Sequence, residues 1–175
     1  NIFEAVDSDL GNHFSIMRKE KLLDLANRKG KAPGGYCTEY YHRRLPFIFM
    51  NAVGTHSDVQ TMLHEGGHAF HVFESNKLPY SSQRDVGIEF AEVASMAMEL
   101  LASPYLTKEH GGFYENDQAK RAQIEHLEKI IMFWPYMAVV DAFQHWAYTN
   151  PEDAMNPINC DAEWTKLWKR FQTFD

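Results

Sequence analysis

Cysteine is scarce in this sequence. The 175 residues contain only two, Cys37 and Cys160, and neither belongs to a C-x-x-C pair. Two isolated cysteines exclude the disulfide framework that stabilises many small secreted domains. We therefore expect two reduced thiols and a cytoplasmic protein.

Basic clusters and long apolar runs are also missing. The formal net charge is −7, and the densest basic stretch holds three charges, at Arg28, Lys29 and Lys31. So small a cluster indicates a solvated loop, which argues against nucleic acid as a partner. The longest apolar run, residues 130–140, is too short to cross a bilayer and contains Pro135. We therefore expect no membrane partner.

Apolar residues make up 45% of the sequence, which is enough for one domain with a core. Their helical spacing predicts helices over residues 13–28, 58–75, 85–102 and 117–148, and a last helix that begins at Asp161. Ser57 or Asp58 is expected to cap the second of these. Aromatic and β-branched residues at 36–41 and 47–51 predict a short antiparallel pair of strands. The predicted fold is a mainly α single domain over residues 1–175 with a small β element.

The second predicted helix carries His64-Glu65-Gly66-Gly67-His68. Histidines at positions i and i+4 share one helix face, so both imidazoles can bind one zinc ion. Glu65 can then hydrogen-bond a water molecule on the metal and take its proton, as in H-E-x-x-H peptidases. The two glycines destabilise a helix by roughly 1 kcal/mol each relative to alanine, which indicates that a neighbouring segment packs very closely here.

Catalytic zinc sites usually have three protein ligands. By spacing, Glu92 on the next predicted helix can face the two histidines if the helices pack antiparallel. Glu89, Glu99 and His71 are the alternatives, because Glu89 and Glu99 lie on a similar helix face and His71 follows His68 by three residues. Glu89 and Ser95 are also candidates for orienting the ligands.

The zinc motif followed by Glu92-Val93-Ala94-Ser95 resembles the M3 family of metallopeptidases. The stretches 28–37, 46–51 and 141–146 are similar to its oligoendopeptidase F branch. This resemblance extends over nearly the whole chain and implies a gluzincin-type helical core with a small β element beside the active-site helix. It also implies one zinc ion per chain, bound by His64, His68 and Glu92, with Glu65 as general base and acid.

The resemblance implies a zinc metalloendopeptidase that hydrolyses oligopeptides and pairs the substrate backbone with the β element. Family members are longer and carry a downstream segment with tyrosine and histidine that stabilises the oxyanion. This sequence starts at Asn1 and ends at Asp175, before such a segment, so we expect the catalytic core of a longer chain. Tyr36, Tyr40 and Tyr80 are the tyrosines considered near the site.

Two other functions remain possible from the sequence alone. One is a zinc-binding fragment that is catalytically incomplete because the oxyanion segment is absent. The other is a helical interaction domain with a chance motif, which predicts no tightly bound metal. Oligomeric state and cleavage preference are not encoded in any recognisable pattern.

Overall fold

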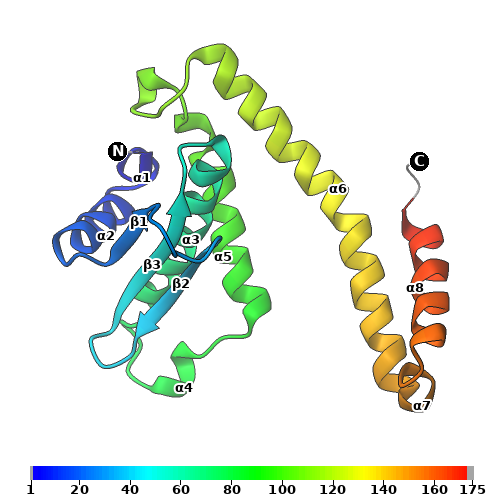
Figure 1. Cartoon of the computed structure of the whole chain (residues 1–175). Coiled ribbons are helices and arrows are strands. Elements are labelled where there is room, and N and C mark those ends of the chain that lie inside the picture. The colour runs from blue at the N-terminus through cyan, green and yellow to red at the C-terminus, as the bar shows by residue number, and fades with distance from the viewer. Residues whose placement is uncertain (1, 173–175) are drawn as a thin grey trace. The chain divides into compact units, whose positions relative to one another are not determined.

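The computed structural model describes residues 2–172, and these divide into two compact units, residues 2–119 and 120–172. The first unit contains the helices α1 (Ile2–Val6), α2 (Ser8–Lys19), α3 (His56–Ser75), α4 (Ser81–Arg84) and α5 (Ile88–Ala102). It also contains the strands β1 (Leu23–Ala26), β2 (Gly35–Tyr40) and β3 (Leu45–Ala52), and two 3₁₀ turns, η1 (Ser103–Tyr105) and η2 (Lys108–His110). The mainly helical fold with a small β element beside α3 is confirmed (Figure 1).

The second unit is helical in its described part. Most of α6 (Asn116–Thr149) lies in it, followed by α7 (Pro151–Ala154) and α8 (Pro157–Phe171). Asn156, not Asp161, caps α8, because the Asn156 side chain accepts a hydrogen bond from the Ile158 N–H at 3.1 Å. None of the described helices combines the length and apolarity needed to span a membrane. The single domain over residues 1–175 stays a prediction.

The sheet has the order β1-β3-β2, with β3 in the centre. β2 pairs antiparallel with β3, which confirms the predicted strand pair, and β1 pairs parallel with β3 on the other side. The buried residues Ile48 and Met50 of β3 face α3 and join a core cluster with Met17, Leu22 and Ala69. Figure 1 shows α3 running along one face of this sheet and α5 beside α3.

The predicted helix over residues 13–28 is wrong in its second half. The helix α2 ends at Lys19, and Lys21 adopts a positive φ of 56° that turns the chain out of the helix. The Leu22 N–H donates to the carbonyl oxygen of Met17 at 2.9 Å and closes this turn. The next residues then form β1, because pairing with β3 places its leucines against the core.

The turn before α3 is held by one carboxylate. Thr55 is the N-cap residue, not Ser57 or Asp58. Asp58 lies one turn inside the helix, and its Oδ2 accepts hydrogen bonds from the N–H groups of Val53, Gly54 and Thr55 at 2.7–3.0 Å. This arrangement is the carboxylate half of a capping box, and it fixes the direction in which α3 leaves the sheet.

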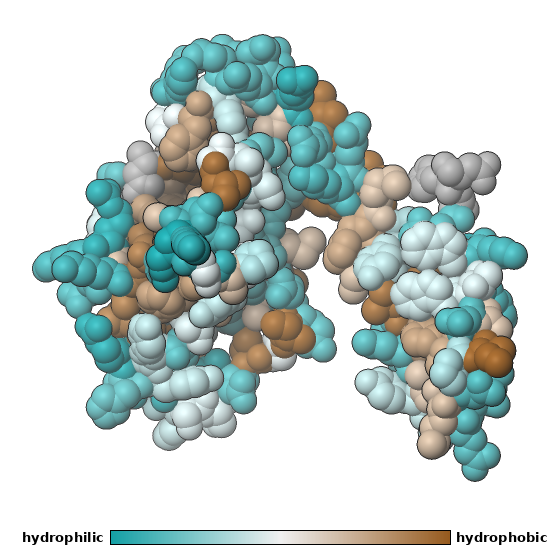
Figure 2. All heavy atoms as spheres, in the orientation of Figure 1, coloured by the Kyte–Doolittle hydropathy of each residue, from teal (hydrophilic) through white to brown (hydrophobic). Residues whose placement is uncertain are grey.

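The surface of the first unit mixes apolar and polar side chains (Figure 2). Several large apolar residues of α5 are exposed, among them Ile88, Val93, Leu100 and Leu101. The face of α5 that carries Ser95, Met98 and Ala102 is instead buried. The helix α5 therefore uses one face for packing inside this unit and leaves another face open.

Candidate metal centre

The helix α3 presents His64, Glu65 and His68 from its middle. The two imidazole rings have centroids 4.9 Å apart and are nearly perpendicular, with an interplanar angle of 84°. This is the outcome expected for histidines one helical turn apart. Both rings are partly buried, with 27% of the His64 side chain and 18% of the His68 side chain exposed.

Glu92 of α5 faces both histidines. Its carboxylate oxygens lie 3.2 Å from His64 Nε2 and 3.6 Å from His68 Nε2. One ligand atom from each of the three residues lies within 4.8 Å of the others. Two imidazole nitrogens and a carboxylate oxygen at this spacing fit the three protein ligands of a catalytic zinc ion. Within residues 2–172, this is the one group of three or more potential ligands that meets such a geometry.

Close packing of α3 against α5 brings these residues together. A methyl group at Gly67 would lie 2.6 Å from both the carbonyl oxygen of Ala94 and the Cα of Ser95. At Gly66 it would lie 2.8 Å from the ring of Phe3. The sequence prediction that these glycines mark a very close neighbour is therefore confirmed, and the neighbours are α5 and α1.

Two residues of the metal group (His64, His68 and Glu92) each have a hydrogen-bonding partner outside it. The Nδ1–H of His64 donates to Oε1 of Glu99 at 2.7 Å, because a carboxylate can only accept. The hydroxyl of Ser95 lies 3.1 Å from Oε2 of Glu92 and can donate to it. In the metal-free protein, the hydrogen bond to Glu99 raises the pKa of His64. Burial lowers the pKa of His68.

Glu65 follows His64 on α3 and is only 7% exposed. Burial raises its pKa, and the charge of Glu92 adds to this, while His64 and the backbone N–H of Cys37 act in the opposite direction. The contact with Cys37 places Glu65 beside β2. β2 is an edge strand of the sheet, since its described partner is β3 alone.

The other residues weighed from the sequence lie outside the metal group. Glu99 binds His64 from the far side of the imidazole, and His71 lies edge-on to the ring of Phe90. Glu89 lies at the start of α5 beside Gly87. Tyr36 stacks on Phe49, and Tyr40 packs at a tilt against Phe47, both on the sheet face away from α3. Tyr80 is 68% exposed.

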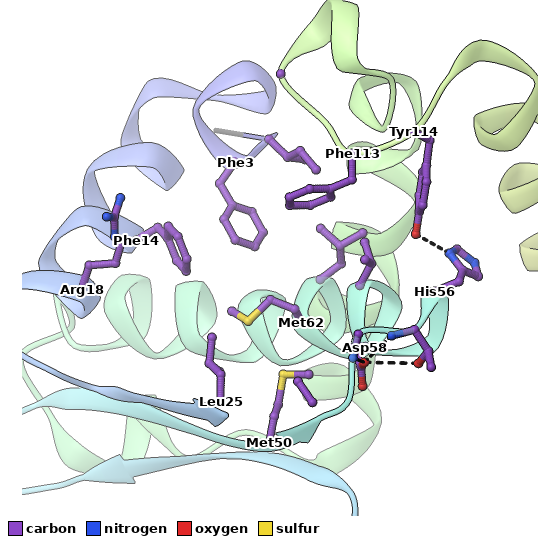
Figure 3. A pocket seen from close by; sticks show the side chains of 17 residues that line it. Phe3, Phe14, Arg18, Leu25, Met50, His56, Asp58, Met62, Phe113 and Tyr114 are labelled. Atoms are coloured by element: carbon purple, nitrogen blue, oxygen red, sulfur yellow. Dashed lines mark hydrogen bonds between the residues drawn. The ribbon is translucent and has the colours of Figure 1, made fainter. Parts of the chain in front are cut away.

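Two of the cavities in the described part of the chain lie beside α3. The smaller, about 340 Å³, is lined by Gly35, Gln60, Thr61, His64, Glu65 and Glu99. The larger, about 680 Å³, is mostly apolar and lies among α1, α2 and the first half of α3 (Figure 3). It contains no residue of the metal group. No sequence motif includes Gln60 or Thr61, so their place in the wall of the smaller cavity could not be predicted from the sequence.

Comparison with known proteins agrees with this geometry. The family model described as "Peptidase family M3" matches residues 3–175. Oligopeptidase PepF of Bacillus subtilis is 33% identical over 101 residues, which cover 55% of this chain and 15% of that protein. Oligoendopeptidase F of Lactococcus lactis subsp. cremoris is 33% identical over 103 residues, 58% of this chain and 16% of that protein. The solved structure of PZ peptidase A with an inhibitor superimposes with a TM-score of 0.84 at 34% identity, over 97% of this chain and 29% of that one.

Proposed function

The chain belongs to peptidase family M3, and we propose that it forms the catalytic core of a zinc metalloendopeptidase that hydrolyses oligopeptides. The observation that carries this proposal is the convergence of His64, His68 and Glu92 with a buried Glu65 beside them. The chain spans only 15–16% of the curated relatives' length, so the proposal concerns the protein that contains it.

His64, His68 and Glu92 would bind the zinc ion. A zinc ion bound there would lower the pKa of a water molecule and polarise the carbonyl group of the substrate. Glu99 would hold His64 in the tautomer whose Nε2 lone pair is free for the ion, and the Ser95 hydroxyl can donate either to the carboxylate or to the backbone carbonyl oxygen of Glu92. Two of the three ligands therefore have a hydrogen-bonding partner in the metal-free protein.

Glu65 acts as general base and then as general acid. Its carboxylate takes a proton from the attacking water, whose oxygen bonds to the carbonyl carbon of the peptide. The same proton then passes to the leaving amine as the C–N bond breaks, so no covalent acyl-enzyme forms. Burial raises the pKa of Glu65 and so makes its carboxylate a stronger base than an exposed glutamate.

The free edge of β2 is the proposed binding site for the substrate backbone. An extended peptide can add to this edge as a further strand, since the edge has unpaired N–H and C=O groups. The contact between Glu65 and the N–H of Cys37, in the middle of β2, supports this proposal. A peptide paired with β2 would therefore pass directly beside Glu65.

A second function is favoured by the small share of the relatives that this chain covers. The residues that stabilise the oxyanion would then come from another part of the protein, and the 175 residues alone would bind zinc without hydrolysing peptides. The free thiols of Cys37 and Cys160 agree with the expected cytoplasmic compartment, which stays a prediction.

Replacing the general base tests the proposal. In the full-length protein that contains this sequence, Glu65→Gln should retain about one zinc per chain and lose roughly 10²–10⁴-fold of kcat/KM on a quenched fluorescent peptide. Glu74→Gln on the exposed end of the same helix is the matched control and should change neither quantity. Turnover by Glu65→Gln close to that of the unchanged protein would refute the role of Glu65. Hydrolysis by the full-length protein but not by the 175 residues would support the second function.

A further inference from the structure

The basic stretch at residues 28–31 contains a buried ammonium group. Arg28 and Lys29 are exposed, as predicted for a solvated loop, but only 1% of the Lys31 side chain is exposed. The prediction of a solvated loop is therefore wrong for Lys31. Burying a charge is costly unless the charge is paired. None of the roles proposed above for the metal, the general base or the substrate backbone uses this residue, so its burial needs a separate explanation.

The ammonium group of Lys31 has a hydrogen-bond acceptor for each of its three N–H donors, and all three acceptors belong to β1. Nζ lies 3.0 Å from the carbonyl oxygen of Asp24, 3.0 Å from its Oδ1 and 2.9 Å from the carbonyl oxygen of Ala26. Arg28 donates two hydrogen bonds to the same carboxylate, and the bonds from Arg28 and Lys31 hold the pKa of Asp24 well below its usual range. Lys31 therefore ties its loop to the end of β1.

The loop of residues 27–34, which we call the crossing loop, passes over the sheet face away from α3. It joins β1 to β2, and these strands lie on opposite sides of β3. Nζ of Lys31 lies 4.6 Å from the centroid of the Phe49 ring of β3, on that face. Gly30 and Gly34 have positive φ angles of 82° and 92° and turn the chain before and after Lys31. The crossing loop is therefore attached to both β1 and β3 before it enters β2.

The crossing loop leads directly into the proposed substrate edge. The N–H of Asn51 donates to the carbonyl oxygen of Gly34 at 3.0 Å. Because backbone groups alternate in direction along an antiparallel strand, the N–H and C=O of the next residue, Gly35, point to the free edge of β2. Gly35 also lines the smaller cavity together with His64 and Glu65. The edge that would pair with a peptide therefore begins beside the reacting groups, one residue after the crossing loop ends.

We propose that Lys31 is a positioning residue for substrate binding, which holds the crossing loop on the sheet and so keeps the free edge of β2 ordered before a peptide pairs with it. This inference rests on the proposed peptidase function. A segment that is ordered in the free protein loses little conformational entropy on binding, so the peptide binds more tightly. Lys31 acts through Gly34 and Gly35 and not by contact with the peptide.

Lys31→Met tests this role, because it keeps a side chain of similar length and removes the ammonium group. In the zinc-loaded full-length protein, the Kd for an octapeptide with a reduced central bond, measured by calorimetry, should rise about tenfold. The KM of a quenched fluorescent peptide should rise in parallel, whereas kcat and the zinc Kd should change by less than about threefold. Lys29→Met, with the same change of charge at an exposed position of the same loop, is the matched control and should change none of these quantities.

Two further measurements report on the edge itself. The amide hydrogens of residues 34–40 should exchange faster in Lys31→Met than in Lys29→Met. Methylating each amide nitrogen of the octapeptide in turn identifies the amide that pairs with β2, because its loss raises the Kd most. This increase should be smaller in Lys31→Met, since the cost of ordering the edge reduces the net gain from pairing.

A second variant disturbs the crossing loop without removing the ion pair. Gly34→Ala places a side chain at a positive φ in open space, and Gly54→Ala does the same before α3. We expect Gly34→Ala to raise the peptide Kd and Gly54→Ala to leave it unchanged. Met17→Ala, in the core on the α3 side of the sheet, controls for a general loss of stability. It should lower the Tm without raising the peptide Kd.

The inference is overturned if Lys31→Met and Gly34→Ala keep the peptide Kd of the unchanged protein, or if Lys29→Met or Met17→Ala raises it as much as they do. Hydrolysis of the fluorescent peptide by the unchanged protein reports on the proposed function by itself. Cleavage with an unaltered Kd in both loop variants refutes the role of Lys31 alone. The absence of both cleavage and peptide binding in the unchanged protein refutes both proposals.

Discussion

The hydrogen bond between Glu99 and His64 allows a quantitative test of the metal centre. Glu99 Oε1 lies 2.7 Å from His64 Nδ1, and only 15% of the Glu99 side chain is exposed. Removing the carboxylate with Glu99→Ala frees the imidazole to rotate and to change tautomer. Loss of such a partner of a metal-binding histidine typically weakens metal binding 10–100-fold, which corresponds to about 1.4–2.7 kcal/mol.

The assay is a competition titration of zinc between the protein and a coloured chelator at neutral pH. We expect the zinc Kd of Glu99→Ala to rise about 10–100-fold. Glu99→Gln should have a smaller effect, because its carboxamide oxygen can still accept the hydrogen bond from Nδ1. Glu89→Ala, at the start of the same helix, is the control and should leave zinc affinity unchanged.

Two results would refute this reasoning. An unchanged zinc Kd in Glu99→Ala would mean that the hydrogen bond does not orient His64. A large loss of affinity in Glu89→Ala would place the third ligand at Glu89 and remove the basis for the proposed ligand set. Circular dichroism of each variant distinguishes these outcomes from a loss of fold.

Two further predictions concern how the centre is held. Gly67→Ala should lower the free energy of unfolding by about 1–3 kcal/mol in urea titrations, because its methyl group meets the backbone of α5. Gly66→Ala should lower the free energy of unfolding by less, because its methyl group meets only the phenyl ring of Phe3. Equal losses in the two variants would contradict this reasoning. The hydrogen bonds from the N–H groups of Thr55, Val53 and Gly54 lower the pKa of Asp58 in the folded protein. The Asp58 carboxylate therefore stabilises the fold at pH values above its ordinary pKa of 3.8, and this stabilisation is lost as the pH falls through its lowered pKa in the folded protein. Asp58→Asn should therefore reduce the urea midpoint at neutral pH and flatten its decline toward acid, whereas parallel pH profiles for both proteins would argue against this role.

The sequence predicts the parts of this fold that depend on local pattern. The helices α3 and α5 follow from apolar residues at helical spacing, and the antiparallel strand pair follows from two β-rich stretches close together in the sequence. The strand β1 does not, because its pairing with β3 joins residues that lie 25 positions apart, Leu23 and Ile48. Its leucines fit a helical stripe equally well, and tertiary contacts decide between the two structures.

The candidate site likewise has residues that local sequence pattern predicts and residues that only tertiary contacts bring in. The spacing of His64 and His68 predicts that they share a helix face, since this depends on one helix only. The position of Gln60 beside His64 in the wall of the smaller cavity has no such signal, because a lone glutamine in a helix matches no motif and the cavity forms only when β2 packs on α3. A cavity wall is assembled from several elements, so its members are visible only in the structure.

Glu92 and Glu99 show how the structure resolves an ambiguity of the sequence. They are seven residues apart, so they lie on the same face of α5, and spacing alone makes either a candidate third ligand. An imidazole has two ring nitrogens that point in different directions, and His64 lies between the two glutamates. Glu92 meets its Nε2 at 3.2 Å and Glu99 meets its Nδ1 at 2.7 Å. The two carboxylates are therefore partners rather than alternatives: one completes the proposed ligand set, and the other fixes the imidazole that both share.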